Sequence, residues 1–264
     1  MTAEILQMTE EEYRKTEGIN FSSLKYMAEG PMKYKWMLSH PSEETKSMSL
    51  GTVCHTAHLE PEKYDSTVML CEHNRGTKKF DAEQKKYPHL IMVTEEELMM
   101  INIQRANFRA NEYYDMINAP DSQTEVAIRW KDAETGLQCK CRIDRYNSNL
   151  LIDVKTSGFS DEHPWINYFY QAYYHCQLAM YTDALIALDS IDRPSICLKF
   201  ETVPCYDCVP YPIPNAVING GRNQYRGWLW NLQNCLETDK WPGLAKKGLR
   251  ELPVKEWALK AQGE

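Results

Sequence analysis

The chain has 264 residues, of which 43% are hydrophobic, so it can bury a substantial core and is not generally disordered. Its 37 acidic and 30 basic residues give a formal net charge of −7. This balance excludes a protein that coats nucleic acid through bulk positive charge, and any contact with DNA or RNA must be local.

The start of the chain and the cysteines both favour a reducing compartment. The N-terminal sequence MTAEILQMTEEEYRK has no basic segment followed by an apolar run, so we expect no signal or transit peptide. The number of cysteines, 9, is odd and their spacing is irregular, which argues against a secreted disulfide framework. We therefore expect a cytoplasmic protein in which most cysteines are small buried side chains.

Helical patterns dominate the first part of the chain. Polar caps and apolar spacing predict helices over residues 19–27, 32–38, 51–59 and from Thr94 to about Met116. Glutamates directly follow Thr94 and suit the positive end of a helix dipole. We expect Pro61 to end the preceding helix, and the mixed, charged residues 62–86 to form loops with partial order.

After Pro120 the apolar period changes to that of strands. Strands are predicted over residues 124–130, 137–146 and 150–156, as a meander. The remaining predictions are a helix over 164–188, a strand over 195–203, a Pro-rich loop from Cys205 to Pro214, a helix over 216–238 and a weakly structured tail. Together they predict a single layered α/β (α+β) domain and leave the direction of the strands open.

The stretch between Glu162 and Asp183 resembles a membrane span at first sight, because it is long and carries no charged residue. It also contains polar side chains that lipid would not accommodate, including His163, Asn167 and Gln171. We therefore expect a buried helix of a soluble domain and no membrane partner.

The densest group of ionisable residues lies in CRIDRY (141–146) and LLIDVKT (150–156). Because strand side chains alternate between faces, Asp153 and Lys155 share one face, and a tight turn would set Asp144 opposite Asp153. A solvated sheet face would also explain charges at alternate positions. However, an unpaired charge is costly in so apolar a strand, which favours a site.

Opposed carboxylates with a nearby ammonium suit the hydrolysis of a phosphodiester. Carboxylate oxygens are the ligands that Mg²⁺ prefers, and a lysine can stabilise or deprotonate an attacking water. A bound cation also offsets the charge that builds on the phosphate oxygens. The residues therefore predict chemistry that depends on Mg²⁺, or on Mn²⁺ in its place.

This constellation resembles the PD-(D/E)xK nucleases, in the branch of RecE exonuclease and other RecB-like nucleases, from about Ile19 to about Tyr181. The resemblance implies a restriction-endonuclease-like core with a central mixed β-sheet flanked by helices. It also implies one domain over residues 1–264, with a nuclease core at about 45–205 and helical additions at both ends.

The resemblance assigns roles to particular residues. The Gly-x-x-x-His motif of the family falls on GTVCH (51–55), the aspartate of Arg-Ile-Asp is Asp144, and Asp-x-Lys is Asp153 with Lys155. These matches imply Asp144, Asp153 and Lys155 as catalytic residues. The implied metal ligands are His55, Asp144, Asp153 and the backbone carbonyl of Val154.

Other positions extend the resemblance. Gln177 and Tyr181 match a Gln-x-x-x-Tyr element that borders the active site in the family, which implies catalytic roles for both. At i and i+4 they share one helical face. Glu125 fits an acidic position on the first strand of the meander, although a polar edge residue would look the same. For His55, as for His58 nearby, a hydrogen-bonded core role is the alternative interpretation.

Other possible sites carry weaker signals. Cys205-x-x-Cys208 has metal-like spacing but no second pair, and an iron–sulfur cluster that adds Cys235 and either Cys54 or Cys71 departs from the compact pattern. The chain has no phosphate-binding loop, so we expect no ATPase motor.

Basic and aromatic groups in the sequence allow two interpretations. The basic groups could contact DNA or be solvated faces; they are Arg142/Arg145, Arg222/Arg226 and Lys246/Lys247/Arg250. The aromatic residues Tyr225, Trp228 and Trp230 could stack on bases, but core packing suits that helix better.

The resemblance implies an ATP-independent exonuclease that acts on double-stranded DNA ends, with 5′-to-3′ polarity, in phage-type homologous recombination. It further implies a homo-oligomeric ring and a single-strand annealing partner of the RecT kind. A ring would reconcile an acidic chain with DNA binding, because basic groups can line the channel. The alternatives are a RecB-like nuclease of another system, such as CRISPR adaptation, and a catalytically inactive DNA-binding nuclease fold.

Overall fold

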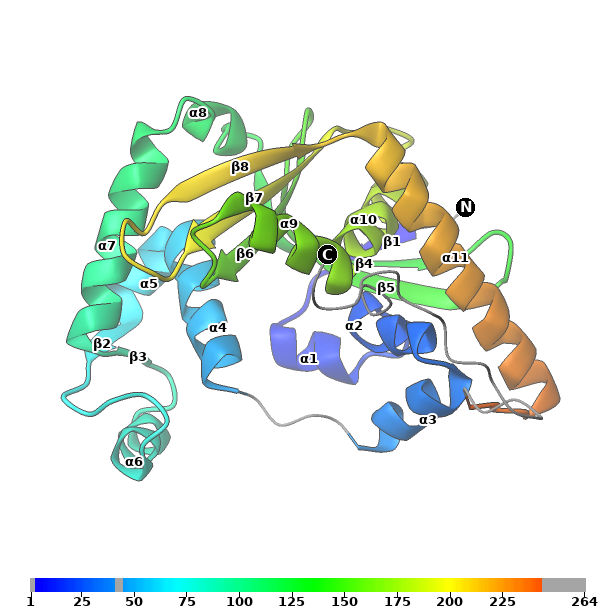
Figure 1. Cartoon of the computed structure of the whole chain (residues 1–264), viewed down its shortest axis with the longest axis horizontal. Helices are drawn as coiled ribbons and strands as arrows, with labels where there is room; N and C mark the ends of the chain where they lie inside the picture. The colour runs from blue at the N-terminus through cyan, green and yellow to red at the C-terminus, as the bar shows by residue number, and fades with distance from the viewer. Residues whose placement is uncertain (1–2, 41–44, 244–264) are drawn as a thin grey trace, which may run out of the picture.

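The computed structural model describes residues 3–40 and 45–243, which are built around a six-stranded β-sheet (Figure 1). Across the sheet the strands are β1 (Ala3–Leu6), β4 (Gln123–Lys131), β5 (Gln138–Tyr146), β6 (Leu151–Ser157), β7 (Ser195–Glu201) and β8 (Cys208–Ile213). The β6–β7 pair is parallel and the other neighbouring pairs are antiparallel, so the sheet is mixed. A short parallel pair, β2 (Val68–Leu70) and β3 (Ile91–Val93), lies outside it.

Helices cover both faces of the sheet. On one face, α2 (Phe21–Leu24), α10 (Tyr174–Asp189) and α11 (Asn215–Thr238) share a core cluster with β4 and β5. On the other face, α4 (Lys46–Leu59) and α7 (Glu95–Ala110) pack against β6 and β7. The remaining helices are α1 (Glu10–Lys15), the 3-10 helix η1 (Lys25–Ala28), α3 (Pro31–Ser39), α5 (Pro61–Thr67), α6 (Lys78–Lys86), α8 (Tyr114–Ile117) and α9 (Glu162–Gln171).

The predicted mixed α/β class and the meander of β4, β5 and β6 are confirmed. Most of the helix starts are also confirmed, because the capping side chains act as expected. The Asn20 side chain accepts a hydrogen bond from the Ser23 N–H at the start of α2. Thr94 and Glu97 form a reciprocal capping box at the start of α7.

Two predictions for the first half of the chain are wrong. Residues 62–86 are not mainly loops, because α5, β2 and α6 lie within them. Pro61 follows the end of α4 as expected, but it also occupies the first turn of α5, where a missing N–H costs nothing. The helix predicted to reach Met116 ends at Ala110, and the short α8 follows separately.

The single helix predicted over residues 164–188 is also wrong. It is divided into α9 and α10 at Tyr173, whose backbone is left-handed with φ 60° and ψ 30°. The division leaves no helix, in the part of the chain that the structure describes, with both the length and the apolar character needed to cross a bilayer.

An edge strand lies in the predicted Pro-rich loop. β8 pairs with β7 alone, so Pro210 and Pro212 sit in a strand with a free edge, where proline is tolerated. The four-residue strand β1, at the opposite edge, was not predicted. The tail beyond residue 243, with Lys246, Lys247 and Arg250, lies outside the described residues, and the predicted domain limits stay a prediction.

Candidate metal centre

Glu125 interrupts the regular geometry of β4. The residues on either side of it pair with β5, but Glu125 and Asp144, which the register would place opposite each other, form no ladder pair. Glu125 has a φ of 55°, a left-handed backbone that is uncommon for a residue other than glycine. Such strain costs on the order of 1–3 kcal/mol and tends to persist at functional sites.

The alternation of side chains in β5 breaks at the same point. Arg145 donates a hydrogen bond to the Leu59 carbonyl at the end of α4, so it lies on the α4 side of the sheet. Ile143 and Tyr146 both belong to the core cluster on the α10 side, although residues an odd number apart normally face opposite ways. Asp144 contacts His55 of α4 and so lies on the same side as Arg145, which places the break in the alternation between these two residues.

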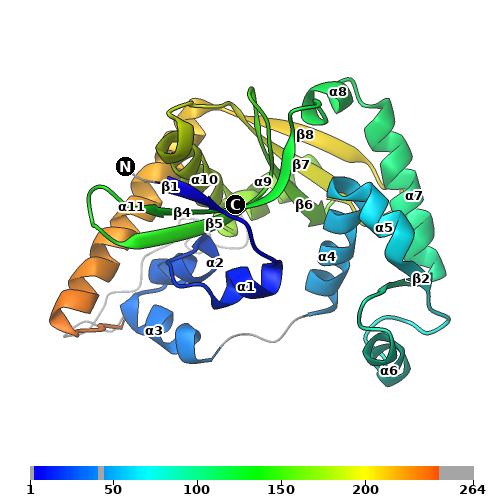
Figure 2. The same ribbon diagram turned by 180° about the vertical axis from the view of Figure 1, so that it is seen from behind.

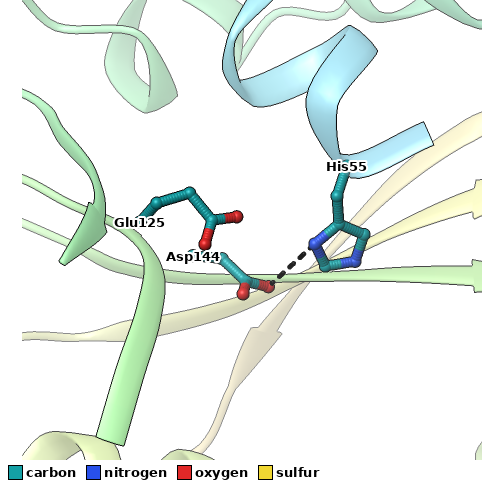
Figure 3. Close-up of side chains that lie close together, drawn as sticks. All are labelled: His55, Glu125 and Asp144. Atoms are coloured by element: carbon teal, nitrogen blue, oxygen red, sulfur yellow. Dashed lines mark ion pairs between the residues drawn. The ribbon is translucent and has the colours of Figure 1, made fainter. Parts of the chain in front are cut away.

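His55 of α4 lies close to Glu125 and Asp144 at this break in the alternation (Figure 3). Each residue offers one ligand atom, and these atoms all lie within 4.8 Å of one another. Nδ1 of His55 is 3.9 Å from Oδ2 of Asp144. The structure thus brings together two of the predicted metal ligands and the additional acid, from three different elements.

The electrostatics of this cluster suit a divalent cation. Burial lowers the pKa of His55 despite the nearby Asp144 carboxylate, so the ring is neutral and keeps a lone pair for a metal. Burial and the Asp144 carboxylate raise the pKa of Glu125 to about 7, although the Nε of Arg142 lies 2.7 Å from Oε2 of Glu125. A cation between the two acids would relieve their repulsion.

Asp144 is held by the backbone of β6. The Val154 N–H donates a hydrogen bond of 2.7 Å to Oδ2 of Asp144. The β5–β6 ladder reaches only to the pair Arg145 and Ile152, so the two strands separate beyond it. Asp144 therefore faces the main chain of Val154. The register of the last ladder pair still places Asp144 opposite Asp153, as predicted, although these two residues form no ladder pair themselves. The role of the Val154 carbonyl as a metal ligand stays a prediction.

Asp153 and Lys155 share a face of β6, as predicted, and that face is turned toward α10. The Lys155 Nζ lies 2.5 Å from Oδ2 of Asp153 and 4.8 Å from the centre of the Tyr174 ring at the start of α10. Asp153 is 0% exposed, and apart from this ion pair its oxygens have no polar partner among the described residues. It is not one of the three clustered ligands.

The Asp153–Lys155 pair keeps a positive charge beside the cluster. Burial raises the pKa of Asp153 and outweighs the effect of Lys155. Burial alone would lower the pKa of Lys155, but the carboxylates of Asp153 and Asp144 outweigh it and raise that pKa above its ordinary value. Lys155 is therefore a cation at neutral pH, near enough to act on the pKa of His55.

Gln177 and Tyr181 lie one turn apart on α10, next to this pair. The Gln177 Nε2 donates a hydrogen bond of 2.8 Å to the Tyr181 hydroxyl. Burial, followed by the Asp153 and Asp144 carboxylates, raises the pKa of the buried Tyr181 well above its ordinary value. Their predicted catalytic roles are untested by this geometry. Tyr174 was not predicted as a site residue, because no pattern in the sequence indicated the break between α9 and α10 that places its ring next to Lys155.

A groove of about 460 Å³ opens onto the three-residue cluster. Glu10 of α1 and Ser22 of α2 line one side, while Met48 and Gly51 of α4 line another. The sequence analysis missed Glu10 and Ser22, because α1 and α2 carry no motif that pointed to the site. Arg142 also lines the groove and links α1 to β4, since its guanidinium contacts Glu125 and lies 3.6 Å from Glu10.

The donor set fits a small divalent ion. Carboxylate oxygens suit Mg²⁺ and Mn²⁺, and a neutral imidazole is also acceptable to Mn²⁺. The buried carboxylate of Asp153, whose one polar partner among the described residues is the Lys155 ammonium, adds a further acid that a cation could satisfy. Among the described residues, His55, Glu125 and Asp144 form the one group of three ligands that meets these distances.

His58 has a structural role, unlike His55. Its Nε2 lies 3.0 Å from Oε1 of Gln104 on α7, and its ring stacks on Phe200 of β7 at 3.7 Å between ring centres. Burial lowers the pKa of His58 to about 3, so the ring is neutral. These contacts join α4 to α7 and β7, which fixes the helix that carries His55.

Several residues that carried weaker sequence signals make structural contacts instead of forming a second site. Arg222 and Arg226 form ion pairs with Asp183 of α10, and the rings of Tyr225 and Trp228 are buried, so this helix uses them for packing. The cysteines are free, and no cysteine belongs to a group of three metal ligands within residues 3–40 and 45–243. The iron–sulfur alternative therefore has no support in this part of the chain.

Comparison with known proteins identifies the family and the fold of the chain. A family model described as a PDDEXK-like domain of unknown function (DUF3799) matches residues 20–248. Among curated proteins, none matches the chain in sequence. The crystal structure of a protein from Eubacterium rectale, named only provisionally as an exonuclease, superimposes with a TM-score of 0.62 at 13% identity and covers 97% of this chain and 99% of that one.

At 13% identity, the likeness to the protein from Eubacterium rectale shows the fold alone. A second structure, of the protein SSO0001, has 17% identity and covers 87% of this chain and 89% of that one, but its TM-score of 0.28 is too low to support an argument. The family match and the mixed sheet together show the restriction-endonuclease-like fold that the sequence analysis expected.

Proposed function

The chain belongs to this family of PDDEXK-like domains, and we propose that it is a metal-dependent, ATP-independent exonuclease that acts on double-stranded DNA ends. The family and the fold support a nuclease. The observation that carries the metal-dependent part is the convergence of His55, Glu125 and Asp144 within 4.8 Å at the end of an open groove.

In this proposal each ligand is held by its surroundings before DNA arrives. The Val154 N–H fixes one oxygen of Asp144, Arg142 fixes one oxygen of Glu125, and packing of α4 fixes His55. Mg²⁺ or Mn²⁺ held there would polarise the scissile phosphate and make water more acidic at neutral pH. Asp153 and the Val154 carbonyl are proposed as further ligands on the resemblance alone.

Lys155 supplies a fixed positive charge and is not proposed as a base. The Asp153 and Asp144 carboxylates keep its ammonium protonated, and the Tyr174 ring lies 4.8 Å from it on another side. A cation held in a buried position offsets negative charge on the phosphate with little reorganisation during the reaction. Gln177, which is half-buried, would contact the DNA strand near the same phosphate, and the buried Tyr181 would position it through their hydrogen bond.

The direction of digestion and the assembly are the finer parts of the proposal. We propose 5′-to-3′ digestion by a homo-oligomeric ring, acting with a single-strand annealing protein in phage-type recombination. The resemblance to RecE-like nucleases supports these points. The net charge of −7 is consistent with a ring, because DNA would then meet locally basic surfaces and not the acidic exterior.

The test compares linear with covalently closed circular duplex DNA, with a separate label on each type of end. We expect the linear duplex alone to be degraded, with Mg²⁺ required, EDTA inhibitory and ATP without effect. Release of the 5′ label as mononucleotides before loss of the 3′ label would support the proposed polarity. Absence of cleavage would favour the inactive DNA-binding fold, and cutting of the circle would contradict an exonuclease.

A further inference from the structure

The helix α6 carries a continuous lysine face. Its sequence KKFDAEQKK includes Lys78, Lys79, Lys85 and Lys86, all of them exposed. At about 100° per residue, these lysines fall within an arc of about 120°, opposite the buried Phe80. Ala82 is the other residue inside this arc, so no acidic side chain interrupts it.

Packing and ion pairs fix the position of α6, the helix that carries the lysine face. Phe80 packs in a small core cluster with Cys71 and Met92. The guanidinium of Arg75, just before α6, bonds both oxygens of Glu97 on α7 at 2.7 and 3.0 Å. It also donates to the Met92 carbonyl and lies over the Phe80 ring at 4.7 Å. The helix is therefore held at a defined place on the molecule.

That place adjoins the groove of the metal centre. The Nη1 of Arg75 donates a hydrogen bond of 2.7 Å to Ser49 of α4, and the neighbouring Met48 and Gly51 line the groove. Figures 1 and 2 both show α6 standing away from the central sheet, on the side where α4 begins. The helix α6 thus stands beyond the N-terminal end of α4, which lines the groove.

We propose that the lysine face of α6 binds the phosphate backbone of duplex DNA whose end occupies the metal centre. The proposal rests on the function proposed above. Exposed lysines act as point charges that contact phosphates without reading bases, which suits an enzyme that must accept any sequence. In a chain of net charge −7, with Glu10, Glu125 and Asp144 in the groove, attraction for DNA must come from such a local surface.

The test measures binding of a linear duplex to full-length protein with Lys155→Met, so that cleavage does not interfere. The variants Lys78→Gln with Lys79→Gln, Lys85→Gln with Lys86→Gln, and all four together are compared over a salt titration. We expect weaker binding, and a slope of log affinity against log salt that falls by roughly 0.9 for each lysine that contacts a phosphate.

Matched controls separate this site from bulk charge. Lys131→Gln with Lys240→Gln removes two exposed lysines at the end of β4 and after α11, far from α6 in both views, and should leave the slope unchanged. Asp81→Asn with Glu83→Gln removes the acids that flank the lysine face and should tighten binding.

The outcomes distinguish the two proposals. Equal affinity and slope for the four-lysine variant and the Lys131/Lys240 control would overturn the lysine-face proposal, even if the wild-type protein cleaves DNA. Such a result would leave a protein partner as the remaining occupant of this face. Absence of Mg²⁺-dependent cleavage by the wild-type protein, with lysine-dependent binding intact, would overturn the nuclease proposal alone.

Discussion

The backbone N–H of Val154 donates a hydrogen bond of 2.7 Å to Oδ2 of Asp144, across the point where β5 and β6 separate. The same carboxylate oxygen lies 3.9 Å from Nδ1 of His55 on α4. One acid therefore connects two consecutive strands to a helix that is distant from them in sequence. Its position depends on the separation of the strands, so the geometry of the sheet and that of the candidate metal centre cannot be varied independently.

Replacing Lys155 with methionine should remove catalysis while leaving the three clustered ligands in place. We expect the cleavage rate to fall by about 10²–10³-fold or more, because a preorganised charge at the phosphate is lost. The measurement is single-turnover cleavage of linear duplex DNA, with Mn²⁺ affinity and circular dichroism as controls for the site and the fold. A rate within tenfold of wild type would contradict the assigned role.

The ring of Tyr174 should hold the Lys155 ammonium in position. Since Nζ lies 4.8 Å from the ring centre, Tyr174→Phe should keep the wild-type rate, whereas Tyr174→Leu should lower it on the order of tenfold. Tyr170→Leu, at an exposed aromatic residue of α9, is the matched control. Equal rates for the phenylalanine and leucine variants would show that the ring has no such effect.

The strained, half-buried Glu125 should make the metal-free protein less stable at high pH. Because burial and Asp144 raise its pKa to about 7, its contribution to stability is fully present below pH about 4.5 and is lost as the pH rises through about 7. In EDTA, the advantage of Glu125→Gln over wild type in free energy of unfolding should grow by about 2–3 kcal/mol from pH 4.5 to pH 8.

Denaturant unfolding at a series of pH values measures this difference. Glu112→Gln, at an exposed position between α7 and α8, controls for the loss of a surface charge. A constant difference between Glu125→Gln and wild type across this range would be inconsistent with a carboxyl held in a buried, repulsive environment. Added Mg²⁺ should stabilise the wild-type protein more than the variant at pH 8, because the metal binds the folded state.

The contact between α10 and α11 predicts opposite effects at two adjacent glycines. A Cβ on Gly221 would lie 2.3 Å from the His175 carbonyl oxygen, whereas a Cβ on Gly220 would meet nothing within 4 Å. Gly221→Ala should destabilise the fold by about 1–3 kcal/mol or more, since the helices must move apart. Gly220→Ala should stabilise it by up to about 1 kcal/mol. Denaturant unfolding measures both, and equal effects would contradict the close packing.

Part of this site was predictable because it depends on local rules. Alternation along β6 places Asp153 and Lys155 on one face, and the resemblance to RecE-like nucleases implied His55 and Asp144 as ligands. The left-handed backbone of Glu125 was not predictable, because the surrounding sheet imposes it against the preference of the residue. For that reason Glu125, which the sequence indicated only weakly, joins the cluster. Asp153 lies outside the cluster and pairs with Lys155.

Elements that depend on tertiary contacts were the ones missed. The break at Tyr173 occurs without glycine or proline, and the strand β8 contains prolines that only an edge position tolerates. The wall of the groove from α1 and α2 comes from segments far from any motif, so no local pattern indicates Glu10 or Ser22 as lining residues.

The most direct test of the central claim is an anomalous diffraction map from crystals of the protein soaked in Mn²⁺. The account predicts a peak between the His55 imidazole and the carboxylates of Glu125 and Asp144, at bonding distance from each, and its absence in crystals of His55→Ala soaked in the same way. A Mn²⁺ peak elsewhere with this cluster empty, or binding that survives the loss of His55 unchanged, would contradict it.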